Sequence, residues 1–120
     1  MRIKIHGYIE NKATKKRENI ETNAIKKNNS IVFKEKDIDY KIKIDNNNIK
    51  IIRETNDFKH ELTFKLNKTI NSLYYIKEYD SSMEIPLTTT KLIYNDNYLE
   101  IEYIINESQE EFKYILEMSE

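Results

Sequence analysis

The stretch FKHELTFKL, residues 58–66, alternates apolar and polar side chains and decides the fold class. Four apolar residues and one histidine share one phase, whereas only Lys, Glu and Thr occupy the other. Because successive side chains of a β-strand point to opposite faces, the pattern predicts a strand with one buried and one solvated face. The same period recurs in RIKI at residues 2–5 and in YKIKI at residues 40–44. The chain is therefore predicted to be all-β.

Asparagine and aspartate separate the periodic segments at places where most proteins would use glycine, of which this chain has one. Both residue types tolerate the left-handed backbone that tight turns require. We expect such turns at Asn28-Asn29, residues 45–48, Asn56-Asp57, Asn67 and residues 95–97. They bound strands predicted at roughly 2–10, 17–27, 30–36, 38–45, 48–55, 58–66, 70–79, 82–94, 97–106 and 109–118.

The connections between these strands are too short for helical crossovers, so neighbouring strands should pair antiparallel. A meander of so many strands leaves exposed edges unless the sheet closes on itself. The sequence therefore predicts a single antiparallel meander closed into a barrel of about eight to ten strands. At 120 residues, the barrel is expected to form one domain spanning residues 1–120.

Composition argues against several classes of function. Twenty Lys and Arg against 21 Asp and Glu give a net charge of −1, so no overall field favours nucleic acid or an anionic membrane. The absence of cysteine excludes disulfides, thiolate metal sites and a cysteine nucleophile. No apolar run approaches the roughly 20 residues of a membrane span. We expect a cytoplasmic protein that is not an enzyme and carries no cofactor and no metal.

Two segments lack a clear strand pattern. Residues 11–19 have no apolar phase and fit either a solvated hairpin loop, which we favour, or a phosphate-binding patch. Residues 108–118 begin with the spacing of a helical capping box, and positions 112, 115 and 116 fit one helix face. Their even positions from 112 to 118 also alternate as a strand. Residue patterns alone leave helix and strand open there.

Two polar residues, His60 and Arg53, fall on predicted buried faces. His60 shares the phase of Phe58, Leu62 and Phe64, so it is either a hydrogen-bonded core or rim histidine, which we favour, or a contact in a ligand cavity. His6, in contrast, falls on a solvated face.

Arg53 follows Ile49 and Ile51 in the same alternation and is expected inside the barrel or at its mouth, whereas Glu54 faces the other way. We favour a structural role for Arg53, paired to an internal acid or capping a barrel end, because a buried guanidinium needs a partner. The alternative is a functional role, in which the planar guanidinium group of Arg53 binds the carboxylate or phosphate of a ligand.

Three tyrosines complete the candidate ligand site at the barrel interior or mouth: Tyr75, Tyr79 and Tyr103. Each combines an apolar body with one polar tip, so each suits a pocket wall as well as a filled core. Tyr75 and Tyr103 are expected to point inward.

Parts of the chain resemble a known family. The segments YIKEYDSSMEIPLTT, residues 75–89, and LEIEYII, residues 99–105, are similar to the uncharacterised bacterial family DUF1934, whose members are YwiB-like calycin (lipocalin-like) β-barrel proteins. Ile51-Ile52-Arg53 resembles an upstream strand of that family, and the likeness spans roughly residues 30–118. The matching positions are Tyr75, Tyr79, Met83, Thr89, Ile101 and Tyr103.

The chain departs from the family pattern at its turns. Lys77-Glu78 replaces a Thr-Pro pair, and Asp80 and Asn56 stand where the family has glycine. The resemblance implies a calycin-like barrel in which the C-terminal segment is a strand. It implies no particular activity, because a shared fold does not determine function.

Two hypotheses of function follow. In the first, the barrel binds a small anionic or amphipathic molecule at its mouth, with Arg53, His60 and inward tyrosines as the polar contacts. In the second, side chains fill the barrel, which acts without catalysis through protein–protein contacts or oligomerisation, for example as a homodimer. The volume of any internal cavity distinguishes them.

Overall fold

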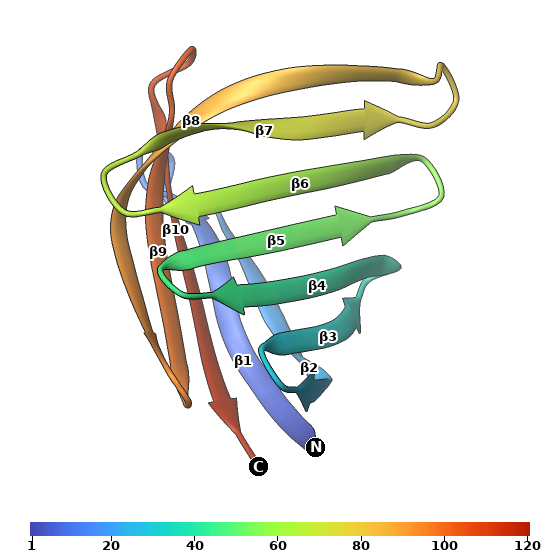
Figure 1. The fold of residues 1–120 in the computed structure, drawn as a ribbon, viewed down its shortest axis with the longest axis vertical. Coiled ribbons are helices and arrows are strands. Elements are labelled where there is room, and N and C mark those ends of the chain that lie inside the picture. The colour runs from blue at the N-terminus through green and yellow to red at the C-terminus, as the bar shows by residue number, and fades with distance from the viewer.

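The computed structural model describes all 120 residues and consists of ten strands without a helix. Every strand pairs antiparallel with its sequence neighbour, and pairing of the first strand with the last closes the barrel (Figure 1). The strands are β1 Arg2–Asn11, β2 Arg17–Lys27, β3 Ser30–Glu35, β4 Ile38–Asp45, β5 Asn48–Glu54, β6 Phe58–Lys65, β7 Thr69–Ile76, β8 Ser81–Asn95, β9 Tyr98–Ile105 and β10 Glu110–Ser119.

The predicted closed antiparallel meander is thereby confirmed, and most strand ends fall within one or two residues of their predicted positions. The C-terminal segment that residue patterns left open is strand β10, as the family resemblance implied. Residues 11–19 form the end of β1, a turn and the start of β2. No helix of the length and apolar character needed to cross a membrane is present.

Strand β8 changes the direction of the sheet. In Figure 1 β4–β7 run across the view, whereas β1, β9 and β10 run down it, and the long β8 curves from one group to the other. A bulge between Thr89 and Lys91 interrupts the pairing of β8 with β9. Bulges increase local twist and bend a strand, so this one lets β8 belong to both parts of the barrel.

The turns use left-handed backbone at some predicted positions and side-chain hydrogen bonds at others. Asn28, Asn46 and Asn67 have φ values of 55°, 52° and 61°, as expected for asparagine in tight turns. The turn at Asn56-Asp57 was expected to do the same and does not. There the hydroxyl of Thr55 accepts hydrogen bonds from the backbone N–H groups of Asp57 and Phe58 at 3.0 and 3.2 Å.

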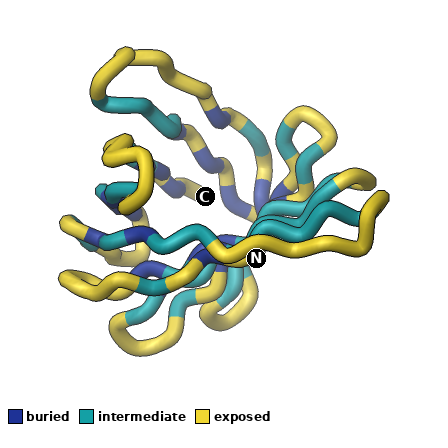
Figure 2. The backbone as a smooth tube through the Cα atoms, turned by 90° about the horizontal axis from the view of Figure 1, so that it is seen from above, coloured by how far each residue is buried: buried dark blue, intermediate teal, exposed yellow.

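Apolar side chains of one phase meet inside the barrel. Figure 2 shows buried residues within the strands and exposed residues at the turns around the rim. Ile5, Ile42, Ile101 and Leu116 each expose 1% or less of their surface, and full burial of such a side chain stabilises the fold by about 1.5–3 kcal/mol. The opposite phase carries most of the charged residues, which explains how a chain this polar still encloses a core.

The single glycine lies on the strand pair that closes the barrel. Gly7 of β1 is buried and sits opposite Leu116 of β10 and Ile20 of β2. A Cβ atom at this position would lie 1.8 Å from the carbonyl oxygen of Ile115, far inside van der Waals contact. Glycine in a strand often marks such a close approach of two backbones, and here it allows β1 to seat against β10.

Candidate ligand-binding cavity

One end of the barrel holds a cavity of about 250 Å³. Ten of its 14 lining residues are hydrophobic, and the polar ones come from β2, β5, β6 and β7. The lining consists of Ile9, Glu18, Ile51, Arg53, His60, Leu62, Phe64, Ser72, Ile85, Leu87, Tyr103, Ile105, Phe112 and Tyr114.

Strand register brings polar and aromatic side chains into one row on the inner face of the sheet, and the middle two, Arg53 and His60, line the cavity. Tyr40 of β4 lies opposite Arg53 of β5, which lies opposite His60 of β6, which in turn lies opposite Tyr74 of β7. Paired residues of adjacent strands point to the same face of a sheet, so all four share the inner face. The His60 ring meets the Tyr74 ring edge to face, with centroids 5.2 Å apart. The predicted inward phases of Arg53 and His60 are therefore correct.

Three buried polar atoms in the cavity lining have no hydrogen-bond partner: Nε of Arg53, Nε2 of His60 and the hydroxyl oxygen of Tyr114. Native structures satisfy most buried polar groups, because an unpaired one costs roughly 1–3 kcal/mol. Tyr114 is 3% exposed, and its hydroxyl therefore cannot rely on bulk water. The cavity thus gathers unused hydrogen-bonding capacity in one place.

The expected internal acid beside Arg53 is not there. No ion pair of the structure includes Arg53, whose guanidinium instead lies 5.5 Å from the centre of the Tyr40 ring. Glu54 faces outward, as predicted, and pairs with Lys77 at 2.8 Å. Glu18 lines the cavity but is exposed and forms no ion pair with the guanidinium. Of the two structural roles expected for Arg53, pairing with an internal acid was wrong, because the one acid of the cavity lining, Glu18, is exposed and does not pair with it; capping of a barrel end stays a prediction.

Burial also sets the charge states in the cavity. Burial, with a smaller contribution from the neighbouring charge of Arg53, lowers the pKa of His60 to about 4. Burial raises the pKa of Tyr103 to about 12 and raises the pKa of Tyr114 further. At neutral pH, His60 and both tyrosines are therefore neutral, and Arg53 supplies the positive charge of the cavity.

Aromatic rings form one side of the cavity. The Tyr103 ring of β9 lies between Phe64 of β6 and Phe112 of β10, at centroid distances of 5.0 and 5.4 Å. The planes of Tyr103 and Phe112 are only 20° apart, which is a stacked arrangement, whereas Phe64 is tilted by 51°. We call these three residues the aromatic wall.

The structure brings together three of the five predicted site residues. Arg53, His60 and Tyr103 line the cavity. Tyr75 lies on the outer face, where its hydroxyl donates to the carboxylate of Asp80, and Tyr79 is 72% exposed in the turn after β7. The expected inward orientation of Tyr75 was wrong by one residue, because Tyr74 occupies the inner phase of β7.

Sequence reasoning missed three residues of the lining that carry a polar group, the tyrosine among them. Tyr114 shares the even phase of β10 with Phe112, and this alternation was a usable signal once that segment is taken as a strand. Ser72 donates to the carbonyl oxygen of Ile85 at 3.0 Å, and a lone serine in a strand gives no signal. Glu18 belongs to the charged stretch 11–19, which has no apolar phase to orient it.

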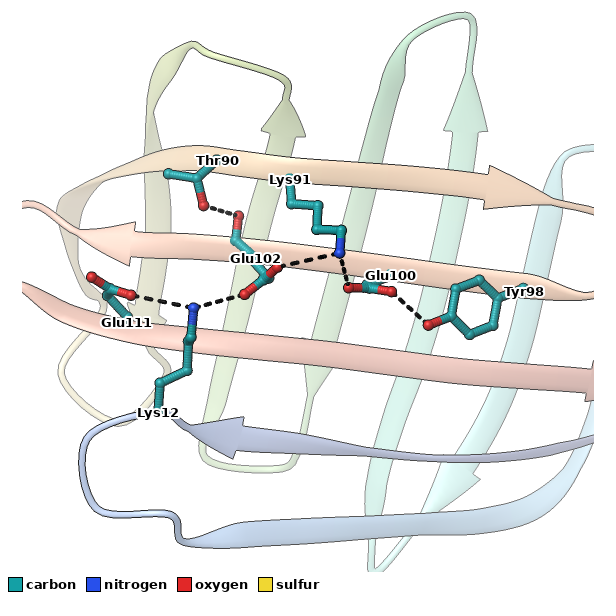
Figure 3. Close-up of polar contacts among 7 residues, drawn as sticks. All are labelled: Lys12, Thr90, Lys91, Tyr98, Glu100, Glu102 and Glu111. Carbon is teal, nitrogen blue, oxygen red and sulfur yellow. Dashed lines mark hydrogen bonds and ion pairs between the residues drawn. The ribbon is translucent and has the colours of Figure 1, made fainter.

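A second polar cluster lies outside the barrel, across β8, β9 and the β1–β10 pair (Figure 3). Lys12 bridges Glu102 at 2.7 Å and Glu111 at 3.4 Å, and Lys91 bridges Glu100 at 2.8 Å and Glu102 at 3.7 Å. We call this cluster, together with the two residues described next, the outer network.

Two hydroxyl groups complete the outer network. Tyr98 donates to the Glu100 carboxylate at 2.6 Å, and Thr90 donates to the Glu102 carbonyl oxygen at 3.2 Å. The hydrogen bonds from Lys91 and then Tyr98 lower the pKa of Glu100, whose side chain is only 8% exposed. The same bond to Glu100 raises the pKa of Tyr98 to about 12.

Neither a family model nor a curated protein sequence matches the chain. Among solved structures, its fold is similar to that in the crystal structure of the ywiB protein from Bacillus subtilis. The two share 11% sequence identity and align with a TM-score of 0.69 over 98% of this chain and 89% of that one. An identity this low shows a common fold alone. The expected YwiB-like barrel fold is thus confirmed, and membership of DUF1934 and of the calycins stays a prediction.

Proposed function

We propose that this protein binds one small amphipathic anion in the cavity. The observation that carries the proposal is the Arg53 guanidinium, which lines an apolar cavity without any carboxylate partner. The guanidinium is half-buried, and a charge that is partly removed from water is stabilised by a partner of opposite sign. An anion would supply the missing partner, and the planar fork of arginine suits a carboxylate or phosphate.

The lining supports an amphipathic ligand over a purely ionic one. Isoleucine, leucine and aromatic side chains surround the polar atoms, so a ligand with an apolar body gains from burial while its charged end meets Arg53. A volume of about 250 Å³ lies just below the roughly 300–1,000 Å³ usual for drug-sized ligands. The proposed ligand is accordingly small.

The cavity also supports binding over the alternative of a barrel filled by its own side chains. The proposed role is binding without catalysis, because the lining offers no paired nucleophile and base. The hydroxyl of Ser72 is engaged with a backbone carbonyl, and His60 forms no hydrogen bond to it.

Isothermal titration calorimetry with hexanoate and hexan-1-ol tests the proposal, since the two share an apolar chain and differ in charge. Hexanoate should bind and hexan-1-ol should bind at least about tenfold more weakly, a difference of about 1.4 kcal/mol. Arg53→Met should abolish the preference for hexanoate, because it removes the only Lys or Arg side chain of the lining.

Arg17→Met is the matched control, since Arg17 is an exposed arginine that pairs with Glu10 at 2.9 Å outside the cavity. This variant should keep the preference for hexanoate. Equal affinity of wild-type protein for both compounds, or no binding of either, would contradict the proposal. The second result would favour a barrel that acts through protein contacts.

A further inference from the structure

We infer that the anion is a planar aromatic carboxylate with a single ring, the carboxylate facing Arg53 and Tyr114 and the ring lying against the aromatic wall. The inference rests on the proposed function and names its ligand class. Three independent features of the lining carry it: the number of cations, the hydrogen-bonding atoms left without partners, and the rings beside them.

The number of cations favours a monoanion. Arg53 is the only Lys or Arg of the lining, and no other cation lies in the paired row that crosses the wall. His60, with its lowered pKa, adds no charge at neutral pH. A phosphate monoester carries a charge of about −1.5 to −2 and is usually held by several cations or a metal. Glu18, the one acid of the lining, is exposed and does not pair with Arg53, so one guanidinium is left to match one ligand carboxylate.

The unpartnered atoms also fit a carboxylate. Nε of Arg53 is an N–H donor, and the Tyr114 hydroxyl can donate to one oxygen of the ligand. The neutral imidazole of His60 also has a buried Nε2 without a partner, and this nitrogen can donate in one of the two tautomers. An ionised carboxylate only accepts hydrogen bonds, which is the role that donors of this kind require of a partner.

The aromatic wall favours a ring as the apolar part. Tyr103 and Phe112 are already stacked, and a flat ring in the cavity can extend this arrangement by offset or edge-to-face contact. Such contacts add roughly 0.5–1.5 kcal/mol to the effect of burial. The volume of about 250 Å³ leaves room for a compact ring and disfavours a long chain.

Calorimetry on the wild-type protein with benzoate, cyclohexanecarboxylate, phenyl phosphate and benzamide tests the inference. Cyclohexanecarboxylate keeps the charge and ring size of benzoate and lacks its planarity and π-electrons, so benzoate should bind about tenfold more tightly. Benzamide lacks the charge and phenyl phosphate exceeds it, and both should bind at least about tenfold more weakly than benzoate.

Phe112→Leu should reduce the ratio of benzoate to cyclohexanecarboxylate affinity several-fold, because it removes the ring stacked on Tyr103 and keeps an apolar side chain in its place. Phe58→Leu is the control, because Phe58 stacks on Tyr74 and does not line the cavity. Should Phe112→Leu fail to fold, the four-compound series on wild-type protein still decides the matter.

The outcomes separate this inference from the proposed function. Equal affinity for benzoate and cyclohexanecarboxylate overturns the aromatic preference, and tighter binding of phenyl phosphate overturns the carboxylate. If hexanoate binds and benzoate does not, the inference fails while the proposed function stands. If neither hexanoate nor benzoate binds, both fail.

Discussion

The polar residues inside the barrel and those of the outer network follow opposite rules. Inside, Arg53, His60 and Tyr114 each carry a buried atom without a partner. Outside, Lys91 and Glu100 pair at 2.8 Å, and their neighbours complete a continuous chain of contacts (Figure 3). Paired groups near the surface help to join strands, whereas unpaired groups in the interior reduce stability. The outer network therefore contributes to the stability of the sheet, whereas the unpartnered polar atoms of the cavity lining do not.

Gly7→Ala should have the largest effect on stability, because it disrupts the strand pair that closes the barrel and so opens the interior to solvent. The added Cβ meets the Ile115 carbonyl at 1.8 Å, and neither backbone can move without disrupting the β1–β10 pairing. We expect a loss of about 3 kcal/mol or more in the free energy of unfolding. Urea denaturation measures it, with exposed His6→Ala as a control that should change stability by less than about 0.5 kcal/mol. A Gly7→Ala protein as stable as wild type would contradict the close approach.

Acidification should affect the two regions in different pH ranges. His60 has a pKa near 4 in the folded protein and about 6.5 when unfolded, so the unfolded state binds more protons between these values. Stability should therefore fall as the pH drops from about 6.5 to 4, by about 1–2 kcal/mol after allowing for partial exposure. Glu100 has a lowered pKa in the folded protein, so its contribution to stability is complete above its unfolded pKa of 4.5. That contribution is lost as the pH falls below this value.

Urea melts of wild type and His60→Gln between pH 7 and 4 isolate the first effect. Above pH 4.5 the free energy of unfolding of His60→Gln should depend less on pH than that of wild type, because the variant lacks the imidazole of His60. Identical slopes for both proteins in that range would show that His60 is not shielded from water.

Removing one hydroxyl from each region should change stability in opposite directions. Tyr98→Phe deletes the donor to Glu100 at 2.6 Å and should lower the free energy of unfolding by about 1 kcal/mol. Tyr114→Phe deletes a buried hydroxyl that has no partner and should raise it by up to about 1 kcal/mol. Thermal and urea melts of the two variants give both signs. A loss of stability in Tyr114→Phe would reveal a partner for that hydroxyl.

Arg53→Met should have the smallest effect on stability, below about 1 kcal/mol. The variant relieves an unpaired charge and at the same time loses the contact with the Tyr40 ring, which is worth about 0.5–1 kcal/mol. Removing one partner of a buried ion pair would instead cost about 3–5 kcal/mol. A urea melt of the variant without ligand distinguishes these values. A loss in the higher range would indicate that an internal acid does pair with Arg53, as the sequence suggested.

Sequence patterns predicted the barrel well because each strand alternates strongly and each turn carries its own local signal. The phase of β6 follows from three apolar residues, Phe58, Leu62 and Phe64, that alternate with polar ones as only a strand would bury them on one side. Strand β7 shows the limit. Its sequence contains Leu73-Tyr74-Tyr75-Ile76, where apolar or aromatic residues occupy both phases, so the pattern could not reveal which tyrosine points inward.

The cavity was less predictable because its properties depend on what lies across the barrel. Alternation placed Arg53 inside, yet whether an acid meets it depends on β2, β9 and β10, which are remote in sequence. The aromatic wall likewise combines β6, β9 and β10, and only the closed strand order brings Phe64 beside Tyr103. Local patterns specify the direction of each side chain, and the closed sheet specifies its neighbours.

The pairing of β1 with β10 also has a consequence for folding kinetics. Nine of the ten strand pairings join sequence neighbours, so they can form as hairpins with little loss of loop entropy, whereas β1 and β10 are separated by most of the chain. This pairing should therefore form last, after the transition state. Substitutions that weaken it should mainly accelerate unfolding and leave the refolding rate nearly unchanged. The lifetime of the folded state would then depend on the strand pair that contains the only glycine of the chain.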